Sequence, residues 1–180
     1  RAFGCVPTDD EGRVQAFLEK TDNPPTDQIN AGCYVFRREV IDAIPAGRPV
    51  SVERETFPGL LEAGRRLQGH VDATYWLDLG KPEAFVQGSA DLVRGVAPSA
   101  AVAQPGDFLV LEGSSIHEGA TVRGGSAVGA QCTVADGAVL DGAILFDGAV
   151  VGEGAVVERS IIGAGALVQA GAVLRDAVVG

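Results

Sequence analysis

The chain is 180 residues long and contains no methionine, one tryptophan, two tyrosines and three cysteines. The cysteines (Cys5, Cys33 and Cys132) are odd in number and far apart. This argues against a disulfide framework or a zinc site and favours a reducing, cytoplasmic setting. No apolar run predicts a signal peptide or a membrane span. Because methionine is absent and the chain stops at Gly180 inside a repeat, we expect both ends to have been cut from a longer chain.

Basic side chains are also scarce. Lysine and arginine together number 14 against 24 aspartates and glutamates, which gives a formal net charge of −10. An acidic chain without a basic cluster argues against nucleic acid or an anionic membrane as partner. A phosphorylated small molecule stays compatible with this composition, because it needs only a few local cations.

The last third of the chain has a hexapeptide rhythm, in which an aliphatic residue returns every six positions and the step shortens at intervals. Two stretches that begin at Leu140 and Val157 superimpose at a shift of 17 residues. Repeats this short cannot bury their apolar side alone, so they must stack into a solenoid. The recurring residues are Ile116, Val122, Val128, Val134, Leu140, Leu145, Val151, Val157, Ile162, Val168, Leu174 and Val179.

The repeat is too short for a pair of helices and is rich in glycine and β-branched residues, which favours short strands joined by corners. Three strands per turn form a triangular coil with a thin interior, and only Phe146 follows Phe108 as an aromatic residue. The pattern resembles the all-β, left-handed parallel β-helix of hexapeptide-repeat proteins, an exception to right-handed crossovers. We predict this fold for residues 107–180, with Cys132 as a small interior or corner residue. Its flat faces of small side chains predict a homo-oligomer.

Residues 1–96 instead alternate expected strands with expected helices, which predicts an α/β domain, and an incomplete one. A linker at residues 97–106 is low in charge and rich in alanine and proline. The expected strands are residues 3–7, 14–18, 31–36, 67–71 and 74–77. The expected helices are residues 38–44, residues 53–63 with a break at Pro58, and residues 82–93 with Pro82 in the first turn.

Three short clusters in this part could carry chemistry. Glu19 and Lys20 close an expected strand and could project into a cleft, although such a pair is also common on solvated surface. Asn30 opens a strand, where its amide could bind sugar hydroxyls or make an ordinary turn. Asp78 follows the apolar strand expected at 74–77, where a carboxylate is costly unless it is paired or bound to a cation. Asp78 is therefore a candidate metal ligand, with helix capping as the alternative.

Taken in order, the clusters resemble the sugar-1-phosphate nucleotidyltransferases, and most of all their mannose-1-phosphate guanylyltransferase branch. In that branch a Rossmann-like catalytic domain leads into a left-handed β-helix, so the resemblance covers both parts of the chain. The motifs are Phe-Leu-Glu19-Lys20, Ile29-Asn30-Ala-Gly-Cys-Tyr-Val-Phe36, Ser51-Val-Glu53-Arg-Glu-Thr-Phe57-Pro58 and Tyr75-Trp-Leu-Asp78-Leu-Gly-Lys-Pro82-Glu83.

The resemblance implies a reaction in which a sugar 1-phosphate attacks the α-phosphate of a nucleoside triphosphate and releases pyrophosphate. In this branch the sugar is mannose and the nucleotide is GTP. The chemistry depends on positioning and on charge neutralisation. Mg²⁺ held by one or two carboxylates suits it, and Asp78 would be one of these ligands.

The resemblance also implies roles for the other motif residues. Lys20 would meet the sugar phosphate as a point charge. Glu19 and Asn30 would hold sugar hydroxyls, and Gly32 would let the backbone approach the substrate. Glu53 would position the sugar or support the site.

Two departures from the family pattern limit these expectations. Thr21 stands where the family usually has proline after the Glu-Lys pair. The glycine-rich nucleotide loop and a further metal-binding aspartate have no counterpart, since in the family they precede the region that begins at Arg1. We therefore expect these residues to carry the sugar side of a site and not to catalyse the transfer alone. The sequence does not decide whether the base is guanine or another base, or whether the sugar is mannose or glucose.

Two alternatives also stay open. A hexapeptide-repeat acyltransferase would use a histidine of the solenoid as its base, and His117, beside Glu118, is the only candidate. A regulatory subunit would keep the fold without turnover. The retained Glu19, Lys20 and Asp78 speak against that second alternative.

Overall fold

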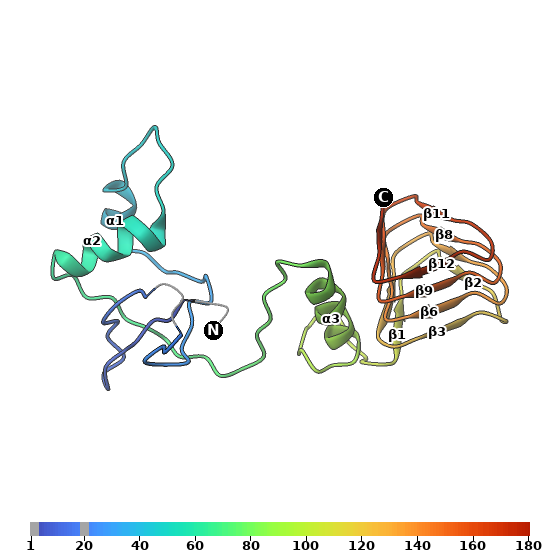
Figure 1. Ribbon diagram of the computed structural model, residues 1–180, viewed down its shortest axis with the longest axis horizontal. Helices are drawn as coiled ribbons and strands as arrows, with labels where there is room; N and C mark the ends of the chain where they lie inside the picture. The colour runs from blue at the N-terminus through green and yellow to red at the C-terminus, as the bar shows by residue number, and fades with distance from the viewer. Residues whose placement is uncertain (1–3, 19–21) are drawn as a thin grey trace. The chain divides into compact units, whose positions relative to one another are not determined.

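A computed structural model describes residues 4–18 and 22–180 (Figure 1). The chain divides into two compact units, Arg1–Ala73 and Thr74–Gly180. In the described ranges, no helix is long and apolar enough to cross a membrane.

The regular elements described in the first unit are short helices, and most of its other described residues lie in turns and irregular segments. It contains α1 (Arg38–Asp42), the π-helix η1 (Val52–Thr56) and α2 (Phe57–Glu62), which follows η1 without a break in the chain. The helix expected at residues 53–63 is therefore present as two consecutive pieces that join just before Pro58. Phe57 is buried and forms the centre of an aromatic cluster, stacked on Phe17 at 4.6 Å and on Phe36 at 5.7 Å between ring centroids.

The strands expected in the described part of residues 1–77 are wrong as continuous elements. In their place the structure has isolated antiparallel bridges, such as Cys5 with Leu18 and Arg13 with Gln68. Residues 31–36 and 74–77 form no strand. The physical reason is that a strand needs a neighbour along its whole length, whereas these segments meet their partners at single points.

The second unit contains a helix, α3 (Pro82–Val93), and a parallel β-solenoid of about four turns. The helix has the bounds that the sequence predicts, with proline at its first position. The strands are β1 (Phe108–Val110), β2 (Ser115–Ile116), β3 (Thr121–Arg123), β4 (Ser126–Val128), β5 (Thr133–Val134), β6 (Val139–Asp141), β7 (Ile144–Leu145), β8 (Val150–Val151), β9 (Val156–Glu158), β10 (Ile161–Ile162), β11 (Leu167–Val168), β12 (Val173–Arg175) and β13 (Val178–Val179).

Each strand pairs with the strand three places further along the chain, so the coils stack into three parallel sheets (Figure 1). One sheet has the order β1-β4-β7-β10-β13, and the other two have the orders β11-β8-β5-β2 and β12-β9-β6-β3. Leu140 pairs with Val157, which is the 17-residue shift of the sequence repeat. Leu140 also pairs with Val122, so the first coil is one residue longer.

The solenoid interior contains one aliphatic side chain per strand, as the sequence predicts. All twelve residues of the predicted series lie in the core cluster or pack against it. Leu140, Val151, Val157 and Ile162 are fully buried. The buried part of this cluster contains no aromatic ring, and Phe146 points outward with 44% of its surface exposed. The prediction of a thin interior without room for rings is confirmed, and Cys132 is buried within it.

Helix α3 packs against β1 and β4. The extra residue of the first coil lies in the Gly124–Gly125 turn, where the second coil has only Gly142. A Cβ atom on Gly125 would lie 2.6 Å from the Cβ of Ala90 in α3, so a larger residue would displace the helix. The φ of Gly125 is 76°, and this is a second reason for glycine here, because a residue with a side chain adopts this left-handed conformation only at a cost in free energy. Helix α3 therefore packs against the turn that the extra residue of the first coil lengthens.

An ion pair supports the later coils at the equivalent turn. Arg159 and Asp176 occupy stacked positions with φ of 43° and 49°, in the left-handed region that non-glycine residues rarely adopt. Their side chains form a bidentate ion pair. Arg159 Nε donates to Asp176 Oδ1 at 2.8 Å, and Arg159 Nη2 donates to Asp176 Oδ2 at 2.9 Å. The hydrogen bond from Arg159 lowers the pKa of the Asp176 carboxyl, and the pair holds two strained turns together.

We predict that Leu140→Ala lowers the free energy of unfolding of the solenoid by about 2–5 kcal/mol, because it leaves a cavity among fully buried neighbours. The matched control is Leu167→Ala, since Leu167 is 64% exposed and its truncation should change stability by no more than about 0.5 kcal/mol. Urea denaturation followed by circular dichroism measures both. Equal effects of the two substitutions would contradict the assignment of the core.

Candidate functional site

Three polar side chains of the first unit form a closed hydrogen-bonded network. The Asn30 amide nitrogen donates to the Tyr34 hydroxyl oxygen and to Glu53 Oε1, each at 2.7 Å. The Tyr34 hydroxyl in turn lies 3.3 Å from the same Glu53 oxygen and donates to it. The backbone N–H of Gly32 donates to Asn30 Oδ1 at 3.0 Å. The structure thus brings together three predicted site residues (Asn30, Gly32 and Glu53) with a tyrosine that the sequence reasoning did not select.

Local backbone structure explains why these side chains meet. Ser51 caps η1, with its hydroxyl accepting from the N–H of Arg54 at 3.2 Å, and this places Glu53 in the first turn of the π-helix. Single π-turns are frequent at functional sites. Gly32 has a φ of 77°, which lets the chain fold back so that its N–H reaches Asn30. Phe57, the residue after η1, packs edge-on against the Tyr34 ring at 5.0 Å.

The network lies at the surface, where a solute can reach it. Asn30 is half-buried, Glu53 is exposed and Tyr34 keeps 36% of its surface in solvent. Partial burial raises the pKa of the Tyr34 phenol, and the nearby Glu53 carboxylate raises it further. The phenol is therefore protonated at neutral pH and serves as a hydrogen-bond donor.

The other predicted site residues are not part of the network that the described residues form. Glu19 and Lys20 fall outside the residues that the structure describes. Asp78 belongs to the second unit, where it is exposed and its Oδ1 accepts from the N–H of Gly80 at 3.1 Å. The argument that Asp78 is a carboxylate in an apolar strand is wrong, because residues 74–77 form no strand and the side chain is solvated. The capping alternative is also wrong, since Lys81 is the N-cap of α3 and no side chain caps that helix.

Among the described residues, the fit to Mg²⁺ rests on Asp78 alone. They contain no group of three or more histidine, cysteine, aspartate or glutamate side chains placed to hold a metal ion. The exposed carboxylate of Asp78 suits Mg²⁺ as a single oxygen ligand, because Mg²⁺ commonly keeps several waters and takes one or two carboxylates together with substrate phosphates. The Asp78 carboxylate therefore has the chemistry of one ligand of such a site.

Tyr34 is the functional candidate that sequence reasoning missed. The segment from residue 31 to residue 36 looked like a buried strand, in which a tyrosine is ordinary packing. One signal was present: Tyr34 carries the only polar side chain among the large residues of that segment and lies four positions after Asn30.

His117, the base of the acyltransferase alternative, lies on the solenoid after β2. Its Nδ1 is 3.0 Å from Asp136 Oδ1 and accepts from the N–H of Gly119 at 3.1 Å. The imidazole is half-exposed, and Asp136 lies on the following coil, after the strand that pairs with β2.

Comparison with known families identifies the family of this chain. A family model described as nucleotidyl transferase matches residues 1–95, just over half of the chain. The chain belongs to the nucleotidyl transferase family. A second model, described as the GMPPB C-terminal domain, matches residues 104–180, which include the whole solenoid of this nucleotidyl transferase chain.

Curated relatives agree with both matches. The chain is 66% identical over 122 residues to a mannose-1-phosphate guanylyltransferase of Mycobacterium tuberculosis, covering 67% of this chain and 34% of that protein. It is 34% identical over 127 residues to mannose-1-phosphate guanylyltransferase 1 of Arabidopsis thaliana, covering 67% and 35%. It is also 38% identical over 89 residues to a low-salt glycan biosynthesis nucleotidyltransferase of Haloferax volcanii, covering 47% and 25%. The chain spans about a third of the length of the first two relatives.

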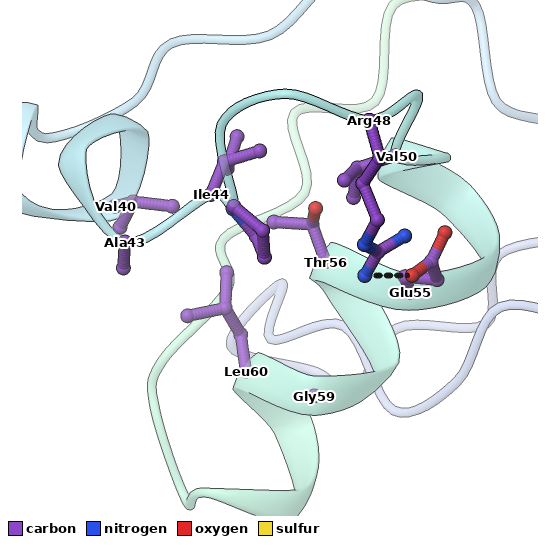
Figure 2. Close-up of a pocket in the computed structure, with 10 residues that line it drawn as sticks. Val40, Ala43, Ile44, Arg48, Val50, Glu55, Thr56, Gly59 and Leu60 are labelled. Atoms are coloured by element: carbon purple, nitrogen blue, oxygen red, sulfur yellow. Dashed lines mark hydrogen bonds and ion pairs between the residues drawn. The ribbon is translucent and has the colours of Figure 1, made fainter.

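Separate from the network, the first unit has a hollow of about 250 Å³ between α1 and the η1–α2 segment (Figure 2). Ile44 and Leu60 contribute to its apolar wall, while Arg48 and Glu55 form an ion pair at 2.9 Å. That hydrogen bond lowers the pKa of the Glu55 carboxyl. The Thr56 hydroxyl is buried and has no hydrogen-bond partner among the described residues. The π-helix thus contributes one side chain to the network and two to this hollow.

We predict that Thr56→Val raises the free energy of unfolding of the first unit by about 1 kcal/mol, because it removes a buried hydroxyl without a partner. The control is Thr8→Val, whose hydroxyl donates to Gln28 at 3.1 Å and whose loss should destabilise. Thermal unfolding measures both variants. A loss of stability in Thr56→Val would show that the hydroxyl has a partner in solution.

Proposed function

We propose that this chain forms the sugar-phosphate-binding part and the β-solenoid of a mannose-1-phosphate guanylyltransferase. Such an enzyme joins GTP and mannose 1-phosphate to give GDP-mannose and pyrophosphate. The observation that carries the proposal is the network of Asn30, Tyr34 and Glu53 on an exposed surface of a nucleotidyl transferase chain. The identity to the mycobacterial relative supports mannose and guanine over other pairs.

The network suits a hydroxylated ligand. A carboxylate accepts hydrogen bonds from sugar hydroxyls, and a few convergent polar groups on a fixed frame set the orientation of a small ligand. Glu53 would hold hydroxyls of the sugar, and Asn30 would contact them only by giving up an internal partner. Gly32, without a side chain, would let the sugar approach the backbone. Glu19 would add a second acceptor and Lys20 a cation for the phosphate.

In the proposed reaction an oxygen of the sugar phosphate forms a bond to the α-phosphorus of GTP. The bond between the α-phosphorus and the oxygen that bridges to the β-phosphate breaks, and its electron pair leaves with pyrophosphate. The contribution of this chain is to bind and orient the attacking phosphate through the sugar. When bound, Mg²⁺ neutralises charge on the phosphates. Asp78 would be one of its ligands.

We also propose a cytoplasmic location and a homo-oligomer. Free thiols at Cys5, Cys33 and Cys132 support a reducing compartment. The solenoid strands expose apolar side chains such as those of Leu167 and Val173, and these support self-association. The acidic net charge of −10 supports partners other than nucleic acid or an anionic membrane.

Calorimetric titration of the chain with mannose 1-phosphate tests the sugar site. We expect saturable binding that Glu53→Gln weakens by about tenfold or more, because a hydrogen bond to a charged acceptor is lost. Glu62→Gln is the matched control, since Glu62 is an exposed carboxylate of the same unit outside the network, and it should bind like the unaltered chain. Unphosphorylated mannose should bind more weakly than its 1-phosphate. Absence of saturable binding, or equal binding by Glu53→Gln, would contradict the proposal.

Paramagnetic Mn²⁺, used in place of Mg²⁺, tests the metal ligand without requiring turnover. We expect Mn²⁺ to broaden the amide NMR signals around residue 78 and excess Mg²⁺ to reverse the broadening. Asp78→Asn should abolish the effect, and Glu83→Gln, which changes a nearby carboxylate in the first turn of α3, should leave it. Broadening that persists in Asp78→Asn would exclude Asp78 as the ligand.

A further inference from the structure

The hydrogen-bond capacity of Asn30 is almost completely used inside the protein. Its amide group has two hydrogens, and both are donated within the network, one to Tyr34 and one to Glu53. Its carbonyl oxygen accepts from the N–H of Gly32. These three bonds fix which way the amide faces. A ligand hydroxyl must therefore displace an internal partner before it can accept from the Asn30 amide.

The hydrogen-bond capacity of the Glu53 carboxylate, by contrast, is only partly used by the network. Both hydrogen bonds that it accepts from the network end on the same oxygen, Oε1. A carboxylate has two oxygens and about four acceptor positions, so with respect to the described residues Oε2 keeps its capacity to accept. Because Glu53 is exposed, this second oxygen can meet a ligand directly.

Tyr34 completes the arrangement. Its hydroxyl accepts from Asn30 and donates to Glu53, so it closes the triangle between the two. Its ring is itself held in place, edge-on to the buried Phe57 at 5.0 Å and tilted against Phe36 at 5.9 Å. A hydroxyl fixed on a rigid aromatic ring loses little entropy when it orients a neighbour.

We propose that Tyr34 is a positioning residue that, with Asn30, fixes the Glu53 carboxylate so that its free oxygen accepts a hydroxyl of the sugar phosphate. This inference rests on the proposed function and deepens it, because it assigns the direct contact to Glu53 and a supporting role to Tyr34. The raised pKa of the Tyr34 phenol agrees with this arrangement, since it keeps the proton that the hydroxyl donates to the carboxylate.

Tyr34→Phe tests the proposal, because it removes the hydroxyl and keeps the ring that packs on Phe57. We expect the dissociation constant for mannose 1-phosphate to rise about three- to tenfold, in line with one neutral hydrogen bond. Tyr75→Phe is the matched control, since it removes the only other tyrosine hydroxyl, which donates to Asp91 at 2.8 Å in the second unit. It should bind like the unaltered chain. Thermal unfolding of Tyr34→Phe checks that the fold is retained.

A double-mutant cycle separates positioning from direct contact. If Tyr34 acts through Glu53, its substitution should cost little further affinity in a Glu53→Gln background, whereas independent contacts would add. A spectroscopic readout accompanies the cycle: in Tyr75→Phe the remaining phenol is Tyr34, and its ultraviolet titration should move to lower pH when Glu53→Gln removes the nearby charge.

The outcomes distinguish this inference from the proposed function. If Glu53→Gln weakens binding while Tyr34→Phe does not, the sugar site stands and the role of Tyr34 is overturned. Full additivity in the cycle, or a phenol titration unmoved by Glu53→Gln, also overturns it. If the unaltered chain binds no sugar phosphate, the proposed function and this inference fall together.

Discussion

The stacking of each coil on the next is the constraint on which the solenoid depends. A coil has only one aliphatic side chain per strand and cannot form a core by itself. Its interior side chains are buried only because each strand pairs in the same register with the strands of the coils before and after it. Leu140, for example, pairs with Val122 in one neighbouring coil and with Val157 in the other. Every departure from the repeat must therefore be absorbed at a turn. The one-residue excess at Gly125 is absorbed there, and α3 rests on it.

The candidate site depends on a different kind of order. The first unit has no stacked repeat in its described residues, and its polar network is held by one capped π-helix, one left-handed glycine and one aromatic cluster. Ser51 places Glu53, Gly32 turns the chain toward Asn30, and Phe57 supports the Tyr34 ring. Because each support acts on a different corner of the triangle, the network is fixed by short local contacts. A small ligand can then be oriented without a deep cavity.

Sequence reasoning predicted the solenoid to the level of single residues, because a period of 17 or 18 residues determines both register and core. It also predicted the bounds of α3 from Pro82 and the apolar pattern that follows. It failed for all the strands expected in the described part of residues 1–77, including 14–18, 31–36, 67–71 and 74–77. The alternation of side chains along a segment indicates which face it can bury but does not identify the partner strand. The error at Asp78 follows directly, because its predicted burial rested on one of those strands.

Sequence reasoning reached only some of the residues of the candidate network. Asn30 and Glu53 were selected by motif, and the structure brings their side chains to 2.7 Å, although 23 positions separate them in the chain. No pattern in the sequence indicates that the amide of Asn30 is used up internally, since this depends on the side-chain directions of three segments. Tyr34 escaped notice for that reason, and the same geometry moves the expected ligand contact from Asn30 to Glu53.

The most direct measurement of the central claim is an NMR titration of the chain with mannose 1-phosphate, in which every amide signal is followed. The account predicts that the signals of Asn30, Gly32, Tyr34 and Glu53 shift together on one saturation curve while those of the solenoid stay in place. Shifts concentrated on the solenoid, for example around His117, with the network unmoved would contradict it.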